Sequence, residues 1–376
     1  MENRKINFGE GRINETAIRH LLDAIQTNWV SQGPKVEEFE KKWGELFGYK
    51  YNVAVSNGTD ADIHALASLY DLGAERGDEI IIPALAFIAV GNSVLAAGFK
   101  PVFVDVEKHT LNINPNLIEQ KITNKTRAIM VVHTMGKPCD MDKIMEIAKK
   151  NNLRVIEDSC EAHGATYKGK LIGTFGDMAT FSAYAAHLIW AGEGGMISTN
   201  EENFAKILRS ARTHGRESIY FDHVRFGLNS RMTDLHASIG LGSLTEFKNI
   251  FEKRKQNLYY LLEKTKDLQK FAFFNLEESY EIVAPHAFSI TLKDPRYDFK
   301  KLYSFLESKG IQCKRNFGSM PTQHKAFAFM NHKLGEFPES EYIGDNGLHF
   351  GIHQYLVKDD LDYISENLHE YFKQFE

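Results

Sequence analysis

Short apolar runs alternate with amphipathic segments from about residue 35 to residue 210. Apolar residues recur at helical spacing in 36–48 (VEEFEKKWGELFG), 60–73 and 143–152, and a further buried helix is expected around Ala89 to Ala97. Between these segments, short β-rich runs predict strands at 52–56, 79–83, 101–106, 127–133, 153–159 and 178–183. This alternation predicts a mostly parallel sheet that is covered by helices on both faces.

The pattern changes after a long helical region at 233–264. The rest of the chain has strand-like and helical runs at 286–292, 298–310, 310–317 and 358–375. We therefore predict an α/β chain with a large domain at 1–245 and a smaller C-terminal α/β domain at 246–376. Roughly the first 30 residues are expected either to belong to the large domain or to pack on the small one.

The stretch from Ile80 to Phe99 contains 20 uncharged residues, which is long enough to consider a membrane helix. Pro83, Gly91 and Gly98 interrupt it, so we interpret it as a strand, a turn and a buried helix. The polar start of the chain has no apolar core of a signal peptide, and no membrane partner is expected.

Composition excludes several other classes of protein. A net charge of −5 and a pI near 6.3, without a basic stripe, argue against binding to nucleic acid. Cys139, Cys160 and Cys313 form neither a CxxC nor a zinc spacing, and they are one short of a four-thiolate iron–sulfur site. We therefore expect no metal and a reducing, cytoplasmic environment.

Three loops that follow predicted strands carry candidate chemistry, at the sheet edge where such folds bind ligands. In SNGTD, 56–60, a glycine at the start of a helix is typical of a phosphate cradle, although ordinary helix caps also have this pattern. In IEDS, 156–159, the acids either cap the next segment or face a protonated heteroaromatic nitrogen, as in enzymes that use pyridoxal phosphate (PLP). The third loop, FSAYAAHLIWAGEGGMIST, contains His187.

Together these stretches resemble the DegT/DnrJ/EryC1/StrS family of sugar aminotransferases, which have the aspartate-aminotransferase fold (fold type I). The resemblance covers most of the chain and keeps one order of motifs. The matching stretches are 29–62, 83–106, 131–144, 156–165, 181–196 and 226–244.

The resemblance implies a cofactor site for PLP or its amine form, pyridoxamine phosphate (PMP). Gly58 and Thr59, helped by Ser182, would hold the cofactor phosphate. Phe87 would stack on the pyridine ring, and Asp158 would pair with the ring nitrogen. For Phe87, a plain core position is the alternative.

Two further positions bear on this site. Glu161 stands where the family usually has a glutamine near the cofactor hydroxyl. Asn229 matches an asparagine that reaches the phosphate of the neighbouring subunit, which implies a homodimer with shared active sites; a turn residue is the alternative.

His187 stands where the family's aminotransferases hold PLP as a Schiff base on a lysine. A minority of the family, resembling the GDP-4-keto-6-deoxymannose 3-dehydratase, carries histidine there, typically after Pro-Ala; Ala185 and Ala186 precede it here. Imidazole cannot form an imine but titrates near neutrality and can move protons, so it suits an elimination.

The resemblance therefore implies a PMP/PLP-dependent 3-dehydratase that acts on a nucleotide-linked 4-keto-6-deoxy sugar in deoxysugar and lipopolysaccharide biosynthesis. L-Glutamate would regenerate PMP. Candidates for contact with the substrate, each with a structural or solvated alternative, are His214, Arg231, Lys314, Arg315 and His349. The alternatives are a sugar aminotransferase whose lysine is replaced by His187 and, less expected, a PLP-binding regulator without catalysis.

Overall fold

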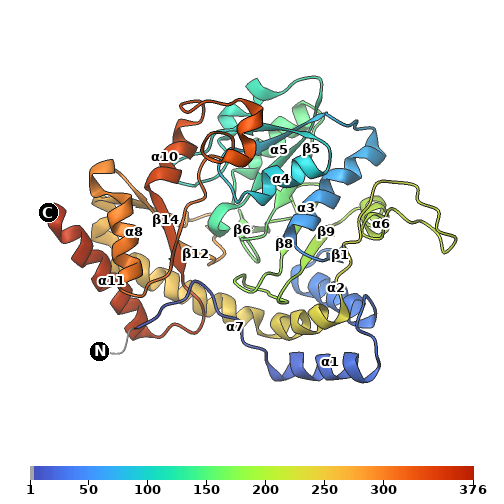
Figure 1. Cartoon of the computed structure of the whole chain (residues 1–376), viewed down its shortest axis with the longest axis horizontal. Helices are drawn as coiled ribbons and strands as arrows, with labels where there is room; N and C mark the ends of the chain where they lie inside the picture. The colour runs from blue at the N-terminus through green and yellow to red at the C-terminus, as the bar shows by residue number, and fades with distance from the viewer. Residues whose placement is uncertain (1–3) are drawn as a thin grey trace.

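The computed structural model describes residues 4–376, and its largest element is a seven-stranded sheet (Figure 1). Residues 1–3, the start of the predicted large domain and of the polar N-terminal stretch, lie outside the described residues. In spatial order the strands are β1 (Tyr51–Val55), β9 (Gly195–Thr199), β8 (Met178–Ser182), β5 (Arg154–Asp158), β4 (Thr126–Val132), β2 (Glu79–Pro83) and β3 (Lys100–Val104). The pairs from β8 to β3 are parallel, whereas β9 runs antiparallel to both of its neighbours.

Helices cover both faces of this sheet. One face packs against α3 (Gly58–Ala67), α4 (Ala89–Ala96) and α6 (Glu202–Ala211), and the other against α2 (Pro34–Phe47), α5 (Met141–Lys150) and α7 (Asp234–Lys264). Strand β4 is apolar without a break from Ala128 to Val132, because both of its faces are buried there. Ala128, Met130 and Val132 enter one core, while Ile129 and Val131 enter the other.

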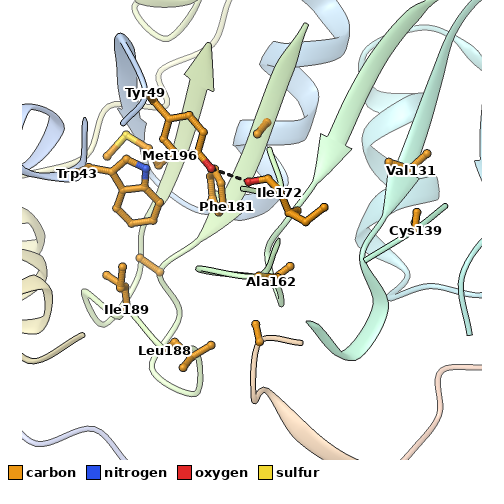
Figure 2. Packing of buried hydrophobic residues seen from close by; sticks show 14 of the residues in the cluster. Trp43, Tyr49, Val131, Cys139, Ala162, Ile172, Phe181, Leu188, Ile189 and Met196 are labelled. Atoms are coloured by element: carbon orange, nitrogen blue, oxygen red, sulfur yellow. Dashed lines mark hydrogen bonds between the residues drawn. The ribbon is translucent and has the colours of Figure 1, made fainter. Parts of the chain in front are cut away.

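Aromatic side chains fill the core on the α2 side of the sheet (Figure 2). Trp43 of α2 packs edge-on against Phe181 of β8, with ring centroids 5.1 Å apart. The buried Tyr49 hydroxyl donates a hydrogen bond to the Ile172 carbonyl at 2.8 Å. Leu188 and Ile189 belong to the same core, so the loop after β8 is anchored immediately after His187.

A second, four-stranded sheet is built from the C-terminal part of the chain. Its order is β10 (Ala272–Phe274), β12 (Ala287–Leu292), β14 (Gly347–Gly351) and β13 (Cys313–Arg315). Its core includes residues of α8 (Phe299–Ser308) and α11 (Lys358–Phe372). Helix α7 runs without a break along both parts of the molecule, and Ile6 pairs with Ile311 beside the small sheet.

The remaining elements are short or peripheral. These elements are α1 (Glu15–Gln26), α9 (Met320–Gln323), α10 (Pro338–Asn346), β6 (Thr166–Tyr167), β7 (Lys170–Leu171) and β11 (Glu281–Ile282). Helix α1 packs on α7. Within residues 4–376, every helix is too short or too polar to cross a bilayer.

Most predicted elements are present with small shifts of their ends, and two differ. The predicted strand at 310–317 is only β13, Cys313–Arg315, because Gly310 and Phe317 adopt positive φ angles that end the extended run. The predicted helix at 60–73 is α3, which begins at Gly58, followed by a 3₁₀ turn at Ser68–Leu72. Strand β14 was not predicted, because two glycines bracket only three residues of strand-like sequence.

Candidate functional site

A cavity of about 720 Å³ lies at the carboxyl ends of β1, β2, β5 and β8. This is the edge where parallel α/β sheets bind ligands. The small sheet closes the opposite wall. The residues that line the cavity include Gly58, Thr59, Phe87, Asp158, Glu161, Ser182, His187, His286, Lys314, Phe317 and His349.

The start of α3 forms a cradle of backbone N–H groups on one wall. The Asn57 side chain caps the helix by accepting a hydrogen bond from the Asp60 N–H at 2.8 Å. A Cβ atom on Gly58 would lie 2.8 Å from Ser182 Cβ, and a Cβ on Gly195 would lie 2.2 Å from the Asn57 carbonyl oxygen. A side chain at Gly58 or Gly195 would therefore prevent the start of α3 from packing this closely against the end of β8 and the start of β9. The helix N-terminus, with Thr59 and Ser182 beside it, therefore fits a phosphate group.

Asp158 ends β5 as a buried carboxylate without a cationic partner among residues 4–376. The Cys160 N–H donates to it at 3.0 Å, while burial raises its pKa. Asp62 of α3 lies nearby, and burial together with the Asp158 charge raises the pKa of Asp62 well above its usual range. Thr180 donates a hydrogen bond to Asp62 at 2.6 Å. A protonated pyridine nitrogen would supply the missing positive charge at Asp158, so this wall fits PLP.

His187 lies in the loop between β8 and β9. Its ring centroid is 5.2 Å from that of His286 and 5.9 Å from that of His163, and its buried Nδ1 has no hydrogen-bond partner within residues 4–376. Burial, and then the charges of Arg254 and Lys314, lower the pKa of His187 to about 3. The ring is therefore neutral at physiological pH. Contrary to the expectation from the sequence, it does not titrate near neutrality, because burial penalises its charged form, and it is a weaker base than a free imidazole.

Arg254 of α7 holds the backbone of this loop. Its guanidinium, 2% exposed, donates to the Ala186 carbonyl at 3.2 Å and to the His187 carbonyl at 3.4 Å. A further bond goes to Gln354 at 2.8 Å. This arginine has no acidic partner within ion-pair distance among the described residues, and burial lowers its pKa to about 10. Arg254 therefore holds the backbone at His187, and its positive charge helps to lower the pKa of the His187 ring.

The four-stranded sheet contributes Lys314 of β13 and His349 of β14 to the cavity. The Lys314 ammonium lies 3.8 Å from the centroid of the Phe8 ring, and burial lowers its pKa. His349 Nδ1 lies 2.9 Å from Asn316 Oδ1. Burial, and then the Lys314 charge, lower the pKa of His349 to about 3.

Phe87 lies at the wall of the cavity with 60% of its surface exposed, which leaves its ring face open to a planar ligand. Its nearest aromatic neighbour is Phe317, whose ring centroid is 6.2 Å away.

Four predicted contact residues lie outside the cavity of a single chain. The Arg315 side chain turns away and donates to Asp345 at 2.9 Å and to the Gly344 carbonyl. Asn229, Arg231 and His214 lie on the segment that follows α6, where Arg231 donates to the Asn229 side chain at 3.1 Å. Figure 1 shows that this segment includes a long loop projecting from the body of the molecule.

Sequence reasoning missed Asp62, Arg254 and His286. Asp62 had a visible signal, because it is an acid in the buried part of an apolar helix that starts at the cradle. Arg254 and His286 had no such signal in the sequence, because the residues that each of them contacts are distant in the chain.

Comparison with known proteins agrees with this geometry. The chain matches the model of the DegT/DnrJ/EryC1/StrS aminotransferase family over residues 12–369. It is 33% identical to the GDP-perosamine synthase of Escherichia coli O157:H7, with 94% of each chain covered. It is 31% identical to the GDP-4-keto-6-deoxy-D-mannose 3-dehydratase of Escherichia coli O55:H7, with 94% of this chain and 95% of that protein covered. The solved E. coli GDP-4-keto-6-deoxy-D-mannose-3-dehydratase with bound hydrated PLP has a TM-score of 0.88 at 28% identity, with 97% of this chain and 100% of that one covered.

The fold and the cavity together define a PLP enzyme of fold type I, as the sequence predicted. Its cofactor is PLP or PMP. The chain belongs to the DegT/DnrJ/EryC1/StrS aminotransferase family, whose members include both sugar aminotransferases and sugar 3-dehydratases.

Proposed function

We propose that this chain is a PMP-dependent 3-dehydratase of a nucleotide-linked 4-keto-6-deoxy sugar. The observation that carries the proposal is His187, an imidazole in the cavity, at the position where the resemblance to the family's aminotransferases implies a lysine. Imidazole moves protons but cannot form an imine with PLP. The cofactor would then be held by non-covalent contacts alone.

Residues on three walls would provide these contacts. The start of α3, with Thr59 and Ser182, would hold the phosphate, Asp158 would face the ring nitrogen, and Phe87 would lie against the ring. Bound as PMP, the cofactor supplies a primary amine and an electron-withdrawing ring for loss of a hydroxyl next to a ketone.

His187 would act as the base. The pKa of about 3 keeps the ring unprotonated at neutral pH but also makes it a weak base, so the transfer would depend on the electron-withdrawing cofactor to acidify the carbon–hydrogen bond. Arg254 would hold the loop so that the ring keeps its place. In contrast to a lysine amine, an imidazole would leave the cofactor without a covalent link to the protein between turnovers.

Lys314 is the single lysine or arginine among the described residues that line the cavity. We propose that it meets an anionic group, either the diphosphate of the sugar nucleotide or a carboxylate of L-glutamate, the amino donor that would regenerate PMP. The residue is exposed, so an anion can reach its ammonium, and the Phe8 ring beneath it keeps the ammonium at the wall of the cavity. The product would enter deoxysugar biosynthesis.

A second copy of the chain would complete the site. The projecting loop exposes Ile219, Tyr220, Phe221 and Val224, and the first two are each 81% exposed. Burial of such a surface favours a homodimer. In it, Asn229 would reach the partner's phosphate site, with Arg231 and His214 on the same segment.

A sugar aminotransferase is the alternative, and one observation favours it. Lys314 brings an amine with a lowered pKa into the cavity, so it is the residue through which a covalent PLP adduct could form. The 33% identity to a GDP-perosamine synthase is compatible with this reading.

Product analysis separates the two functions. Purified protein is given PMP, L-glutamate and a panel of nucleotide-linked 4-keto sugars, and the products are analysed by mass spectrometry. A product that has lost a hydroxyl oxygen and gained no nitrogen supports the dehydratase. A product in which the ketone has become an amine refutes it and supports the aminotransferase.

A further inference from the structure

We infer that Phe317 is a positioning residue, which holds the ring of Phe87 in the orientation that stacks on the cofactor. This inference rests on the proposed contact of Phe87 with the cofactor and adds a residue that acts through that ring. Phe87 follows β2 of the seven-stranded sheet, whereas Phe317 follows β13 of the four-stranded sheet, and both line the cavity. A contact between them therefore joins two walls of the site.

The two rings meet edge to face. Their centroids are 6.2 Å apart and their planes are inclined by 73°, which is within the range of a favourable aromatic pair. Phe87 is 60% exposed, and within residues 4–376 no other aromatic ring pairs with it. Phe317 is less exposed, because it also packs against an apolar cluster that includes Phe8 and Leu85. The better anchored ring thus supports the more exposed one.

The backbone at Phe317 is strained. Its φ of 46° lies in the left-handed region, which residues with a bulky side chain rarely adopt. The Phe317 N–H donates to the Arg315 carbonyl at 2.8 Å, and the Phe317 carbonyl accepts a hydrogen bond from His324 Nε2 at 3.1 Å. The Gly318 N–H donates to the Asn316 carbonyl at 2.6 Å. Strain of this kind persists where the surrounding structure imposes it, and it is concentrated at ligand sites. Glycine would adopt this conformation without strain, so the aromatic ring points to a function of the side chain.

Backbone contacts join the two turns that carry these rings. The Met320 N–H donates to the Ala84 carbonyl at 2.7 Å, and Ser319 pairs with Leu85 in an isolated antiparallel bridge. Leu85 lies two residues before one ring, and Ser319 lies two residues after the other. These contacts fix the distance between the rings, although the rings come from different sheets.

The orientation of the Phe87 ring matters because His187 offers no covalent link to the cofactor in the proposed function. Non-covalent contacts would then supply all of the affinity. An exposed side chain loses rotational freedom when a ligand orders it, and this loss opposes binding. A ring that Phe317 already orients loses less freedom, so the cofactor binds more tightly without any new contact.

The dissociation constant of PMP, measured by fluorescence titration, tests this role. Phe317→Leu removes the ring and should raise the constant about threefold to tenfold, the size of one aromatic pair. Phe317→Met, which also lacks the ring, replaces it if that variant does not fold. Phe317→Tyr keeps the ring and should stay within about twofold of wild type. An unchanged constant in the variants without the ring, or an equal rise in Phe317→Tyr, overturns the inference.

Phe329→Leu is the matched control. Phe329 is also an exposed phenylalanine and pairs with the ring of Phe327, but it lies outside the lining of the cavity. The dissociation constant of PMP should therefore be the same in Phe329→Leu as in wild type. A rise as large as that in Phe317→Leu would mean that loss of any such ring weakens binding, which overturns the specific role of Phe317.

A double-mutant cycle separates support of Phe87 from direct contact with the cofactor. In the Phe87→Leu background, Phe317→Leu should change the constant by less than about twofold, because the ring that it positions is gone. An equal effect of Phe317→Leu in both backgrounds would mean that Phe317 contacts the cofactor itself, and this overturns the inference, as does an unchanged constant in Phe87→Leu. The cycle measures binding alone. If the wild-type protein aminates the sugar, the proposed dehydratase fails, while the cycle still decides the role of Phe317.

Discussion

Replacing His349 with asparagine should make the stability of this protein less sensitive to acid. His349 lies in β14 with 2% of its surface exposed, and its Nδ1 lies 2.9 Å from Asn316 Oδ1. Burial and the nearby Lys314 charge lower its pKa from 6.5 to about 3. The folded protein therefore keeps this ring neutral at pH values where the unfolded chain would protonate it.

The magnitude follows from the difference in pKa between the two states. A histidine whose pKa is depressed by folding contributes stability that is present above its unfolded pKa and lost as pH falls toward its folded pKa. Between about pH 7.5 and pH 5.5, proton binding by the unfolded state at a pKa of 6.5 lowers the free energy of unfolding by about 1.4 kcal/mol. The folded state binds almost no proton at His349 over this range.

Urea unfolding at the two pH values measures this contribution. Wild-type protein and His349→Asn are compared, with His223→Asn, an exposed position, as the control. Glu161, whose raised pKa of about 7 gives stability as pH falls, is present in all three proteins and cancels. The stability advantage of wild type over His349→Asn should shrink by about 1.4 kcal/mol from pH 7.5 to pH 5.5. An advantage that is the same at both pH values would refute the reasoning.

Three further changes test the cofactor site. Asp158→Asn should raise the dissociation constant of PMP at least about tenfold, measured by fluorescence titration, because the ring nitrogen loses its buried carboxylate; unchanged affinity would contradict the pairing. Gly195→Ala should lower the free energy of unfolding by about 1–3 kcal/mol, measured in urea, because its Cβ would overlap the Asn57 carbonyl, and wild-type stability would refute that contact. Borohydride treatment with PLP should leave Lys314 unmodified in peptide mass spectra; a labelled Lys314 peptide would favour the aminotransferase.

Much of the seven-stranded sheet and of its covering helices could be predicted because their signals are local. The β-rich run at 127–133 is β4, Thr126–Val132, and its inner part from Ala128 to Val132 is apolar at every position because it is buried on both faces. The cradle at Gly58 could also be predicted, since one strand, one turn and one helix start are enough to build it. The short β13 and the unpredicted β14 depend instead on partners elsewhere in the chain.

The sequence by itself determined the α/β class and the family, and it singled out His187 as the candidate base, because each depends on residue type at a position within a short motif. Only the tertiary structure decided what surrounds that histidine. Arg254 reaches its loop from α7, and His286 meets Glu161 from the other side of the cavity. Charge and burial act through space, so the pKa of a catalytic group depends on neighbours that no local pattern of residues can identify.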